Sequence, residues 1–199
     1  MQTEIEVKFV NVDIDDVRQR LKAAGATLEH PLRLMRRVII EQPEHRAEHS
    51  FIRVRDEGDR TTLTFKRRKT MDIAKDAHNT QELEVVVSDF DDTVEIFKEA
   101  GWPPISYQES KRETWQLDGT EIVIDVWPWI SPYIEIEAET EEAVKVAARA
   151  LGFSWEAAFY GRIEHVYRLE YDIDPSFQGP IDLKELTFDM TIPAEFKKK

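Results

Sequence analysis

The sequence predicts an α+β fold, in which a sheet of mainly antiparallel strands is flanked by helices. Segments that alternate polar and apolar residues with the period of a strand recur along the chain, beginning with residues 3–9. Asp118-Gly119 joins two such segments and is the strongest hairpin turn in the sequence. A strand–helix unit also recurs, with a Glu-x-Glu strand followed by a helix that ends in Ala-Gly or Leu-Gly, at 4–6, 82–84 and 135–137.

At 199 residues the chain forms one domain, or one domain and a tail, and it is long enough to bury a core. It contains no cysteine, which excludes disulfides and thiolate metal sites and fits a reducing compartment. We find no run of about 18 apolar residues and no basic N-terminal segment followed by an apolar run. We therefore expect a cytoplasmic protein without a membrane partner.

The charge balance argues against a nucleic-acid partner. The chain has 40 acidic and 27 basic residues, a net charge of −13, whereas nonspecific nucleic-acid binding needs a broadly basic surface. The basic residues nevertheless cluster between Arg33 and Lys75. A basic interior within an acidic shell favours small anions as ligands.

The first half of the chain predicts four strands and one helix. Asp13 is the expected N-cap of a helix that ends at Ala24, before Gly25. A polar turn with Pro43 separates two of the strands, and residues 70–80 have no periodicity and predict a mobile loop that could close over a ligand. The strands are expected at 3–9, 33–41, 50–55 and 61–68.

The second half of the chain predicts four more strands and three helices. The strands are expected at 81–87, 106–117, 120–127 and 132–138. Helices are expected at 89–100, 140–150 and 154–172. The residues that follow are poorly patterned and predict a tail.

Charged residues of one sign share one face in strand after strand. Glu4, Glu6 and Lys8 lie on one face of the first strand, where residues two apart are separated by about 6.6 Å. The pattern recurs as Arg53/Arg55, Lys66/Arg68, Glu82/Glu84 and Glu135/Glu137. Like charges on one face repel one another unless counter-ions separate them. A single charged strand is an ordinary solvated surface, but the recurrence favours one polar cavity that binds a polyphosphate with magnesium or manganese.

The histidines, serines and tryptophans of the sequence give weaker indications of a catalytic or binding site. His45 and His49 have the i, i+4 spacing of a helical metal site, but they fall in a polar loop with Pro43, so a surface position is favoured. The sequence has no glycine-rich phosphate loop and no nucleophile-elbow serine. Trp127 and Trp129 flank the second acidic pair and could contact an organic part of a ligand, although tryptophan more often packs in a core.

Glu4-Ile5-Glu6-Val7-Lys8 resembles the signature of the CYTH domain, the family of triphosphate tunnel metalloenzymes. This family includes class IV adenylate cyclases, thiamine triphosphatases and inorganic triphosphatases. The other charged pairs and Asp125 follow in family order, and the resemblance covers about residues 1–170. It implies an eight-stranded antiparallel β-barrel, the triphosphate tunnel, with flanking helices. The expected division is a tunnel domain over residues 1–172 and a C-terminal tail of unknown role over 173–199.

The resemblance also implies roles for the charged residues. One or two magnesium or manganese ions would be held by Glu4, Glu6, Asp125, Glu135 and Glu137. The triphosphate would be bound by Lys8, Arg53, Arg55, Lys66, Arg68 and Arg112. The residues expected to act in catalysis are Glu4, Glu6 and Lys8. Guanidiniums suit phosphate because they stay charged and bind it bidentately, whereas a lysine acts as a point charge.

Three features depart from the family pattern. Lys111 and Arg112 are adjacent and must face opposite ways on a strand, so Arg112 is the expected ligand, with Lys111 second. Residues 35–40 replace an aromatic and acidic strand, so the neighbouring rim is expected to be more basic. Residues 127–132 replace a glycine-containing connection, which puts the local tunnel shape in question but not the acidic pair.

The favoured function is a divalent-metal-dependent triphosphate hydrolase, in which water attacks the terminal phosphate. An adenylate cyclase of class IV type would use the same residues, but the sequence has no stretch typical of a purine pocket. A noncatalytic polyphosphate or nucleotide-binding module is a second class, and a structural protein with a solvated charged sheet is a third. The expected partner is a small-molecule triphosphate, and a homodimer is compatible with the sequence.

Overall fold

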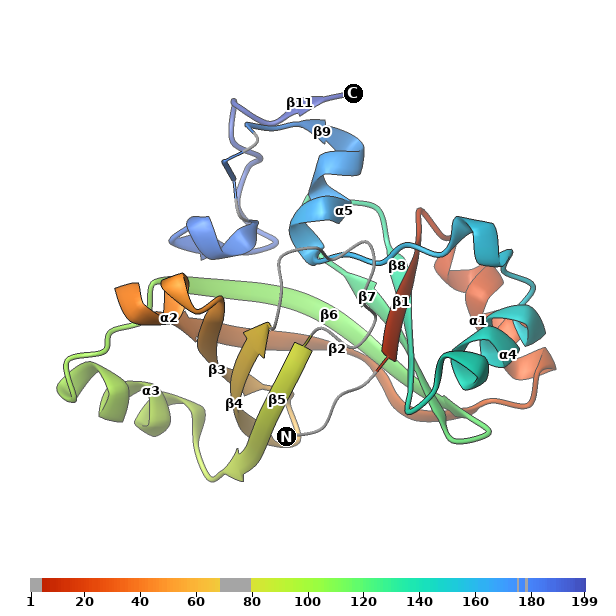
Figure 1. The fold of residues 1–199 in the computed structure, drawn as a ribbon, viewed down its shortest axis with the longest axis horizontal. Coiled ribbons are helices and arrows are strands. Elements are labelled where there is room, and N and C mark those ends of the chain that lie inside the picture. The colour runs from red at the N-terminus through yellow and green to blue at the C-terminus, as the bar shows by residue number, and fades with distance from the viewer. Residues whose placement is uncertain (1–4, 69–79, 175, 178) are drawn as a thin grey trace.

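The computed structural model describes residues 5–68, 80–174, 176–177 and 179–199. Its main feature is a curved antiparallel sheet, in which the long strands β2 and β6 run across the molecule with the shorter strands at their two ends (Figure 1). The strands follow the order β1 (Ile5–Val10), β8 (Tyr133–Ala138), β7 (Thr120–Val126), β6 (Ser106–Leu117), β2 (Thr27–Ile40), β3 (Ser50–Asp56), β4 (Thr61–Arg68) and β5 (Thr80–Val87). The predicted α+β class and the eight antiparallel strands are confirmed.

The sheet is open, and the full closure expected of a barrel is not seen in the described part of the chain. β1 and β5 are the outer strands of the order, and no described backbone pairing joins them. At Lys8 the free edge of β1 is occupied by Phe159, because the two residues exchange backbone hydrogen bonds of 2.9 Å in both directions. This edge is therefore partly satisfied by a segment from outside the eight strands.

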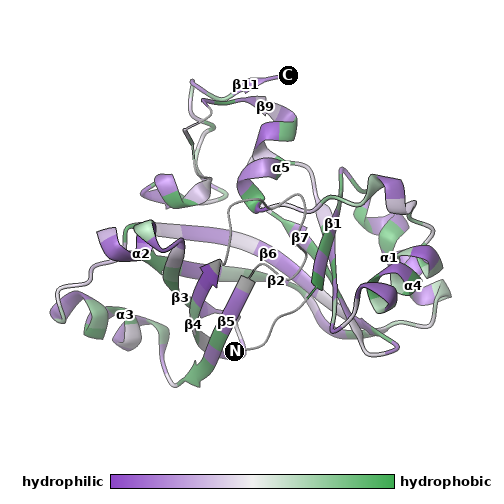
Figure 2. Ribbon diagram, in the orientation of Figure 1, coloured by the Kyte–Doolittle hydropathy of each residue, from purple (hydrophilic) through white to green (hydrophobic). Residues whose placement is uncertain are grey.

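Hydrophilic and hydrophobic residues occur together within single strands, as in β5 (Figure 2). The apolar side chains of β1, β7 and β8, such as Val7, Ile122 and Ile136, are fully buried against two helices. These helices are α1 (Ile14–Ala23) and α4 (Glu141–Ala150), which contribute Leu21 and Val144 to the same core. Because side chains alternate along a strand, the charged residues of these strands must face the opposite side of the sheet.

Local signals explain where the helices begin and end. The side chain of Asp13 caps α1 by accepting a hydrogen bond from the backbone N–H of Asp16, and Asp89 caps α3 (Phe90–Glu99) in the same way. Thr140 caps α4. Gly101 follows α3 with a φ of +83°, a conformation that favours glycine. In the described residues, no helix is long and apolar enough to cross a membrane.

Several sequence predictions are wrong in detail. The helix expected over 154–172 is divided into η2 (Trp155–Ala157), α5 (Ile163–Glu170) and β9 (Tyr171–Asp172). Ala158 and Arg162 have extended backbone, and Phe159 pairs with β1. The turn expected after β2 contains a short helix, α2 (Pro43–Ala47), in which Nδ1 of His45 accepts a hydrogen bond from Gln42 N–H. The loop expected over 70–80 lies outside the described residues, apart from the first residue of β5.

The described residues of the expected tail pack against the rest of the molecule. They include η3 (Pro180–Asp182), β10 (Glu185–Leu186), which pairs in parallel with β6, and β11 (Lys197–Lys198), which pairs with β9. Leu186 is fully buried, and Phe196 packs against Tyr167 and Tyr171. The side-chain oxygen of Ser106 donates to the carbonyl of Leu183 at 2.6 Å. The division at residue 172 stays a prediction.

Candidate functional site

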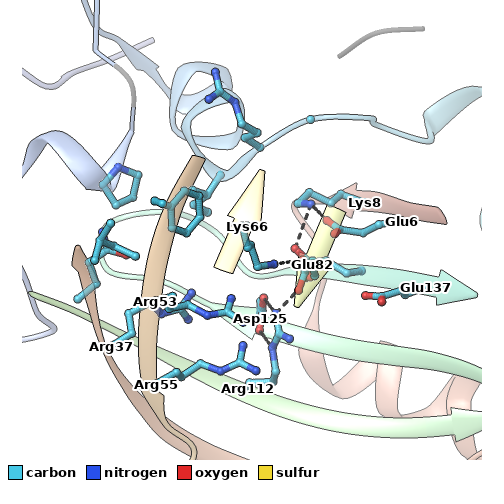
Figure 3. Close-up of a pocket in the computed structure, with 18 of the residues that line it drawn as sticks. Glu6, Lys8, Arg37, Arg53, Arg55, Lys66, Glu82, Arg112, Asp125 and Glu137 are labelled. Carbon is cyan, nitrogen blue, oxygen red and sulfur yellow. Dashed lines mark hydrogen bonds and ion pairs between the residues drawn. The ribbon is translucent and has the colours of Figure 1, made fainter. Parts of the chain in front are cut away.

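A cavity of about 620 Å³ lies on the polar side of the sheet, and all eight strands from β1 to β8 contribute to its wall. The alternation of side chains brings residues two apart, such as Arg53 and Arg55, to the same cavity (Figure 3). The charged residues that strands contribute to the wall are Glu6, Lys8, Arg37, Arg53, Arg55, Lys66, Glu82, Glu84, Arg112, Glu121, Asp125, Glu135 and Glu137.

Most of the side chains predicted for the site therefore meet in one place. These are Glu6, Lys8, Arg53, Arg55, Lys66, Arg112, Asp125, Glu135 and Glu137. Glu4 lies outside the described residues, and so does the side chain of Arg68, whose backbone ends β4. Lys111 faces away from the cavity wall, with its ammonium 4.6 Å from the ring centroid of Phe188.

One side of the cavity is dominated by buried guanidiniums. Arg37, Arg53 and Arg55 are each 8% exposed. The pKa of Arg37 is lowered to about 9, because burial disfavours its charge and the neighbouring guanidiniums, Arg53 first, repel it. Burial and the nearby Arg55 lower the pKa of Arg53 to about 10. The Nε atoms of all three arginines are buried without a hydrogen-bond partner in the described structure. This side of the cavity thus carries excess positive charge.

The opposite side joins carboxylates from β1, β7 and β8 to two cations. The ammonium of Lys8 contacts Glu6 and lies 3.0 Å from Oε1 of Glu135. Arg112 binds Asp125 bidentately, with Nε–Oδ1 and Nη2–Oδ2 distances of 2.8 and 2.6 Å, and its Nη2 lies 3.2 Å from Glu135. Burial alone would raise the pKa of Glu135, but Lys8 and Arg112 lower it to about 2. Glu135 is therefore ionised at neutral pH.

β5 supplies a second set of carboxylates to the cationic side. Glu82 pairs with Lys66, and Oε2 of Glu84 accepts a 2.6 Å hydrogen bond from the hydroxyl of Thr64 and lies 3.4 Å from Arg53. Burial and the nearby Arg53 lower the pKa of Lys66. The Glu82/Glu84 pair identified in the sequence thus balances part of the cationic wall.

Sequence reasoning did not single out Arg37 or Tyr133 as site residues. Arg37 follows Arg36, and only one of two adjacent residues can face the cavity; Arg36 instead pairs with Asp56 at 2.6 Å outside it. The sequence signal that could have indicated Arg37 is the unusually basic stretch 35–40. The hydroxyl of Tyr133 lies 3.4 Å from Oδ2 of Asp125. Trp127 lines the cavity beneath Arg37, whereas Trp129 packs against Phe196.

The carboxylates of the cavity wall are the candidate ligands for a divalent cation. Within the described residues, no group of three His, Asp or Glu side chains has an arrangement that could hold a metal ion. Oxygen donors are nevertheless the class that magnesium and manganese prefer. A positive group, the ammonium of Lys8, already lies between Glu6 and Glu135, so the two carboxylates can share one cation. The donor chemistry of Glu6 and Glu135 is therefore compatible with a divalent cation.

A family model of the CYTH domain matches residues 2–157. The chain belongs to the CYTH family. This family assignment confirms the resemblance that was recognised from Glu4-Ile5-Glu6-Val7-Lys8. The matched segment ends before α5. The part of the cavity wall formed by Arg162, Glu164 and Pro180 therefore lies outside the matched segment.

Solved structures share the fold of this CYTH protein. A candidate adenylate cyclase from Vibrio parahaemolyticus has a TM-score of 0.70 and 12% identity, covering 84% of this chain and 98% of that chain. A conserved hypothetical protein from Pyrococcus furiosus has a TM-score of 0.67 and 21% identity, with 82% and 99% covered. A candidate adenylyl cyclase from Hippeastrum, described as having a dominant triphosphatase activity, has a TM-score of 0.51 and 16% identity, with 85% and 96% covered. None of the curated proteins compared with the chain matches it.

Proposed function

We propose that this CYTH protein is a divalent-metal-dependent hydrolase of a triphosphate, in which water attacks the terminal phosphate. The observation that carries the proposal is the division of one cavity into a cationic side and an acidic side. A polyphosphate bound with a divalent cation needs both kinds of wall. The triphosphatase activity described for the Hippeastrum neighbour agrees with this assignment.

The cationic side would hold the phosphate groups. Arg53 and Arg55 present planar donors that suit phosphate oxygens, and Lys66 adds a point charge. Arg112, from the acidic side, would add a further guanidinium. A bound anion would supply partners to the buried Nε atoms of Arg53 and Arg55, which have none in the described structure. Binding would also offset the repulsion that lowers the pKa of Arg53. These groups are held in place before the substrate arrives, which favours stabilisation of the charge that develops during phosphoryl transfer.

The acidic side would hold magnesium or manganese through Glu6 and Glu135, with Glu4, Asp125 and Glu137 as further oxygen donors. Such an ion would supply Lewis-acid chemistry, offsetting the charge of the phosphate and lowering the pKa of an attacking water. Lys8 contacts both Glu6 and Glu135, so its ammonium is placed to pair with the terminal phosphate at the border of the two sides. Lys8 is protonated at neutral pH, because Glu135 and Glu6 raise its pKa although burial alone would lower it.

The contacts that aromatic side chains of the cavity wall make within the protein favour hydrolysis over cyclisation. Trp127 is covered by Arg37, the hydroxyl of Tyr133 faces Asp125, and Tyr160 packs against Trp155. Phe51 also lines the cavity and, in the described part of the wall, is the remaining aromatic side chain against which a base could stack. Recognition would therefore rest mainly on the phosphate groups. An adenylate cyclase would need the base of ATP to be held as well.

Turnover assays test the proposal directly. The purified protein would be given inorganic triphosphate, thiamine triphosphate or ATP with magnesium or manganese, while released phosphate and cyclic AMP are both measured. We expect phosphate release that stops when EDTA is added. Cyclic AMP as the main product from ATP would contradict the hydrolase assignment.

A single variant separates an enzyme from a binding module. Glu6→Gln removes one predicted metal ligand, and we expect a loss of turnover of about 100-fold or more, the scale of an essential electrostatic group. Asp15→Asn changes an exposed carboxylate of α1 and is the control, with unchanged turnover. If wild-type protein binds triphosphate but releases no phosphate with either metal, the protein is a noncatalytic module.

A further inference from the structure

Arg37 occupies an electrostatically unfavourable position in the sheet. It is directly opposite Arg55 in the β2–β3 register, and both side chains line the cavity. Like charges directly opposite one another on neighbouring strands are destabilising. Both residues are buried, so water screens their repulsion less than it would at the surface.

Arg37 differs from the other strand cations of the wall because, in the described part of the chain, it forms no ion pair. The other five each form an ion pair: Lys8 with Glu135, Arg53 with Glu84, Arg55 with Glu57, Lys66 with Glu82, and Arg112 with Asp125. Among the described residues, no carboxylate forms an ion pair with Arg37, and its Nε has no hydrogen-bond partner. A buried charge without a counter-ion is costly, so the position requires an explanation.

The guanidinium of Arg37 is nevertheless firmly oriented. It lies over the ring of Trp127, 4.5 Å from the centroid, and its Nη2 donates to the hydroxyl of Ser110 at 2.5 Å. Trp127 and Ser110 are themselves buried. A cation–π contact and one hydrogen bond fix the plane of the group. Asp125 is near enough to attract its charge, but no carboxylate of the described residues forms an ion pair with it. This combination is typical of a preorganised anion-binding residue.

The position of Arg37 indicates which part of a ligand it would meet. In the view of Figure 3, Arg37 and Arg53 lie on one side of the cavity, and Glu6, Lys8 and Glu137 lie on the other. The proposed function places the attacked phosphate beside Glu6 and Lys8. Arg37 is then beside the opposite end of the substrate.

We propose that Arg37, held by Trp127 and Ser110, binds the end of the substrate remote from the attacked phosphate and selects substrates in which that end is an unesterified phosphate. This inference rests on the proposed function for the orientation of the substrate, but the anion subsite itself does not. An unesterified end carries more negative charge than a phosphate esterified to an organic group. Inorganic triphosphate should therefore gain more from Arg37 than ATP or thiamine triphosphate does.

The test compares Arg37→Gln with wild-type protein by steady-state kinetics and by calorimetric titration of inorganic triphosphate without metal. For inorganic triphosphate we expect KM and Kd to rise about 10- to 100-fold, the range for loss of a hydrogen bond to a charged group. The rise for ATP should be at least fivefold smaller, and kcat should change little. Arg37→Lys keeps the charge without the planar stack and should recover part of the affinity.

Arg36→Gln is the matched control, because Arg36 is the adjacent cation and pairs with Asp56 outside the cavity. It should leave KM and Kd unchanged. Equal effects of Arg37→Gln on all substrates, or no effect on Kd, would overturn the inference even if wild-type protein hydrolyses triphosphate. If wild-type protein binds triphosphate through Arg37 but releases no phosphate, the subsite stands and the hydrolase assignment fails. An absence of triphosphate binding by wild-type protein would overturn both.

Discussion

Glu57 shows how a residue behind the cavity wall organises the residues in it. Its side chain is buried and pairs with Arg55, while Oε2 lies 3.0 Å from Arg60 Nε and 3.6 Å from Arg33 Nη2. The backbone carbonyl of Glu57 also accepts a 2.8 Å hydrogen bond from Arg33. Glu57 does not line the cavity, so we regard it as a positioning residue for Arg55.

Replacing Glu57 with glutamine should destabilise the protein in a pH-dependent way. Burial alone would raise the pKa of Glu57, but Arg55 and Arg60 lower it below the ordinary value of a glutamate. A carboxylate with a lowered pKa in the folded state stabilises that state above its unfolded pKa, and this contribution is lost as the pH falls. Glu57→Gln should therefore lower the free energy of unfolding at pH 7 by about 3–5 kcal/mol. In urea titrations, the difference from wild type should narrow below about pH 4.

Asp56→Asn is the neighbouring control for this prediction. Asp56 pairs with Arg36 in a more exposed position, so its loss should cost about 1 kcal/mol or less. A Glu57→Gln variant as stable as Asp56→Asn at pH 7, or a difference from wild type that grows in acid, would contradict the role assigned to Glu57.

Residue positions in the site were predictable wherever charges alternate strictly. Glu6/Lys8, Arg53/Arg55 and Glu135/Glu137 are two apart, so the period of the strand places both members of each pair in the cavity. Adjacent cations are ambiguous by the same rule, and Arg36-Arg37 could be resolved only by the pairing of β2. β2 also contains register shifts near His30, in its pairing with β6. Alternation counted from the start of β2 therefore does not predict which of its later residues face the cavity.

At the scale of elements, α5 and η3 shape one part of the cavity wall. Arg162 and Glu164 at the start of α5 form an ion pair, and Pro180 and Ile181 of η3 line the cavity with them. Gly179 directly precedes η3, has a φ of +100° and lies against Glu164 of α5. A Cβ atom at Gly179 would lie 2.7 Å from Cβ of Glu164, so only glycine fits this approach.

Gly179→Ala should therefore separate η3 from α5. Two costs add at this position. The backbone conformation, with φ +100° and ψ −164°, is essentially restricted to glycine and would cost about 1–3 kcal/mol, and the steric conflict with Glu164 would cost about 1–3 kcal/mol. Gly101→Ala is a matched control, because Gly101 has a φ of +83° but no atom within 4 Å of its Cβ position. Thermal or urea unfolding should show the larger loss for Gly179→Ala, and its KM for triphosphate should rise as the wall shifts. Equal losses for the two variants would show that η3 does not press on α5.

Elements were predictable from the sequence where local signals sufficed. Capped helices such as α1 and α3 were located to within a few residues, because Asp13 and Asp89 mark their starts. The segment 158–162 and the two-residue strands β9 and β10 have no local signal of their own. Their conformation depends on partners far away in the chain, such as Lys8 for Phe159 and Tyr107 for Glu185. Long-range pairing of this kind leaves no periodic pattern in the sequence.

At the scale of the whole molecule, the separation of apolar and charged faces explains how an acidic protein can contain a cationic site. The net charge is −13, but four arginines of β2, β3 and β6 line the cavity, namely Arg37, Arg53, Arg55 and Arg112. Acidic residues in the first turns of α1, α3 and α4 lie on the outside of the molecule. They also interact favourably with the positive N-terminal ends of the helix dipoles. A protein of negative net charge can therefore present a cluster of guanidiniums on one side of its cavity.

The packing of the C-terminal residues predicts that they unfold together with the sheet. Phe196 is buried in a cluster with Trp127, Tyr167 and Leu186, and Trp127 also supports Arg37 in the cavity. Phe196→Ala should therefore lower the free energy of unfolding by about 3–5 kcal/mol in a single transition. Lys197→Ala, an exposed neighbour in β11, should change it by about 0.5 kcal/mol or less. Urea unfolding followed by tryptophan fluorescence and by far-UV circular dichroism tests this, since an independent tail would give a second transition and leave the main one unchanged.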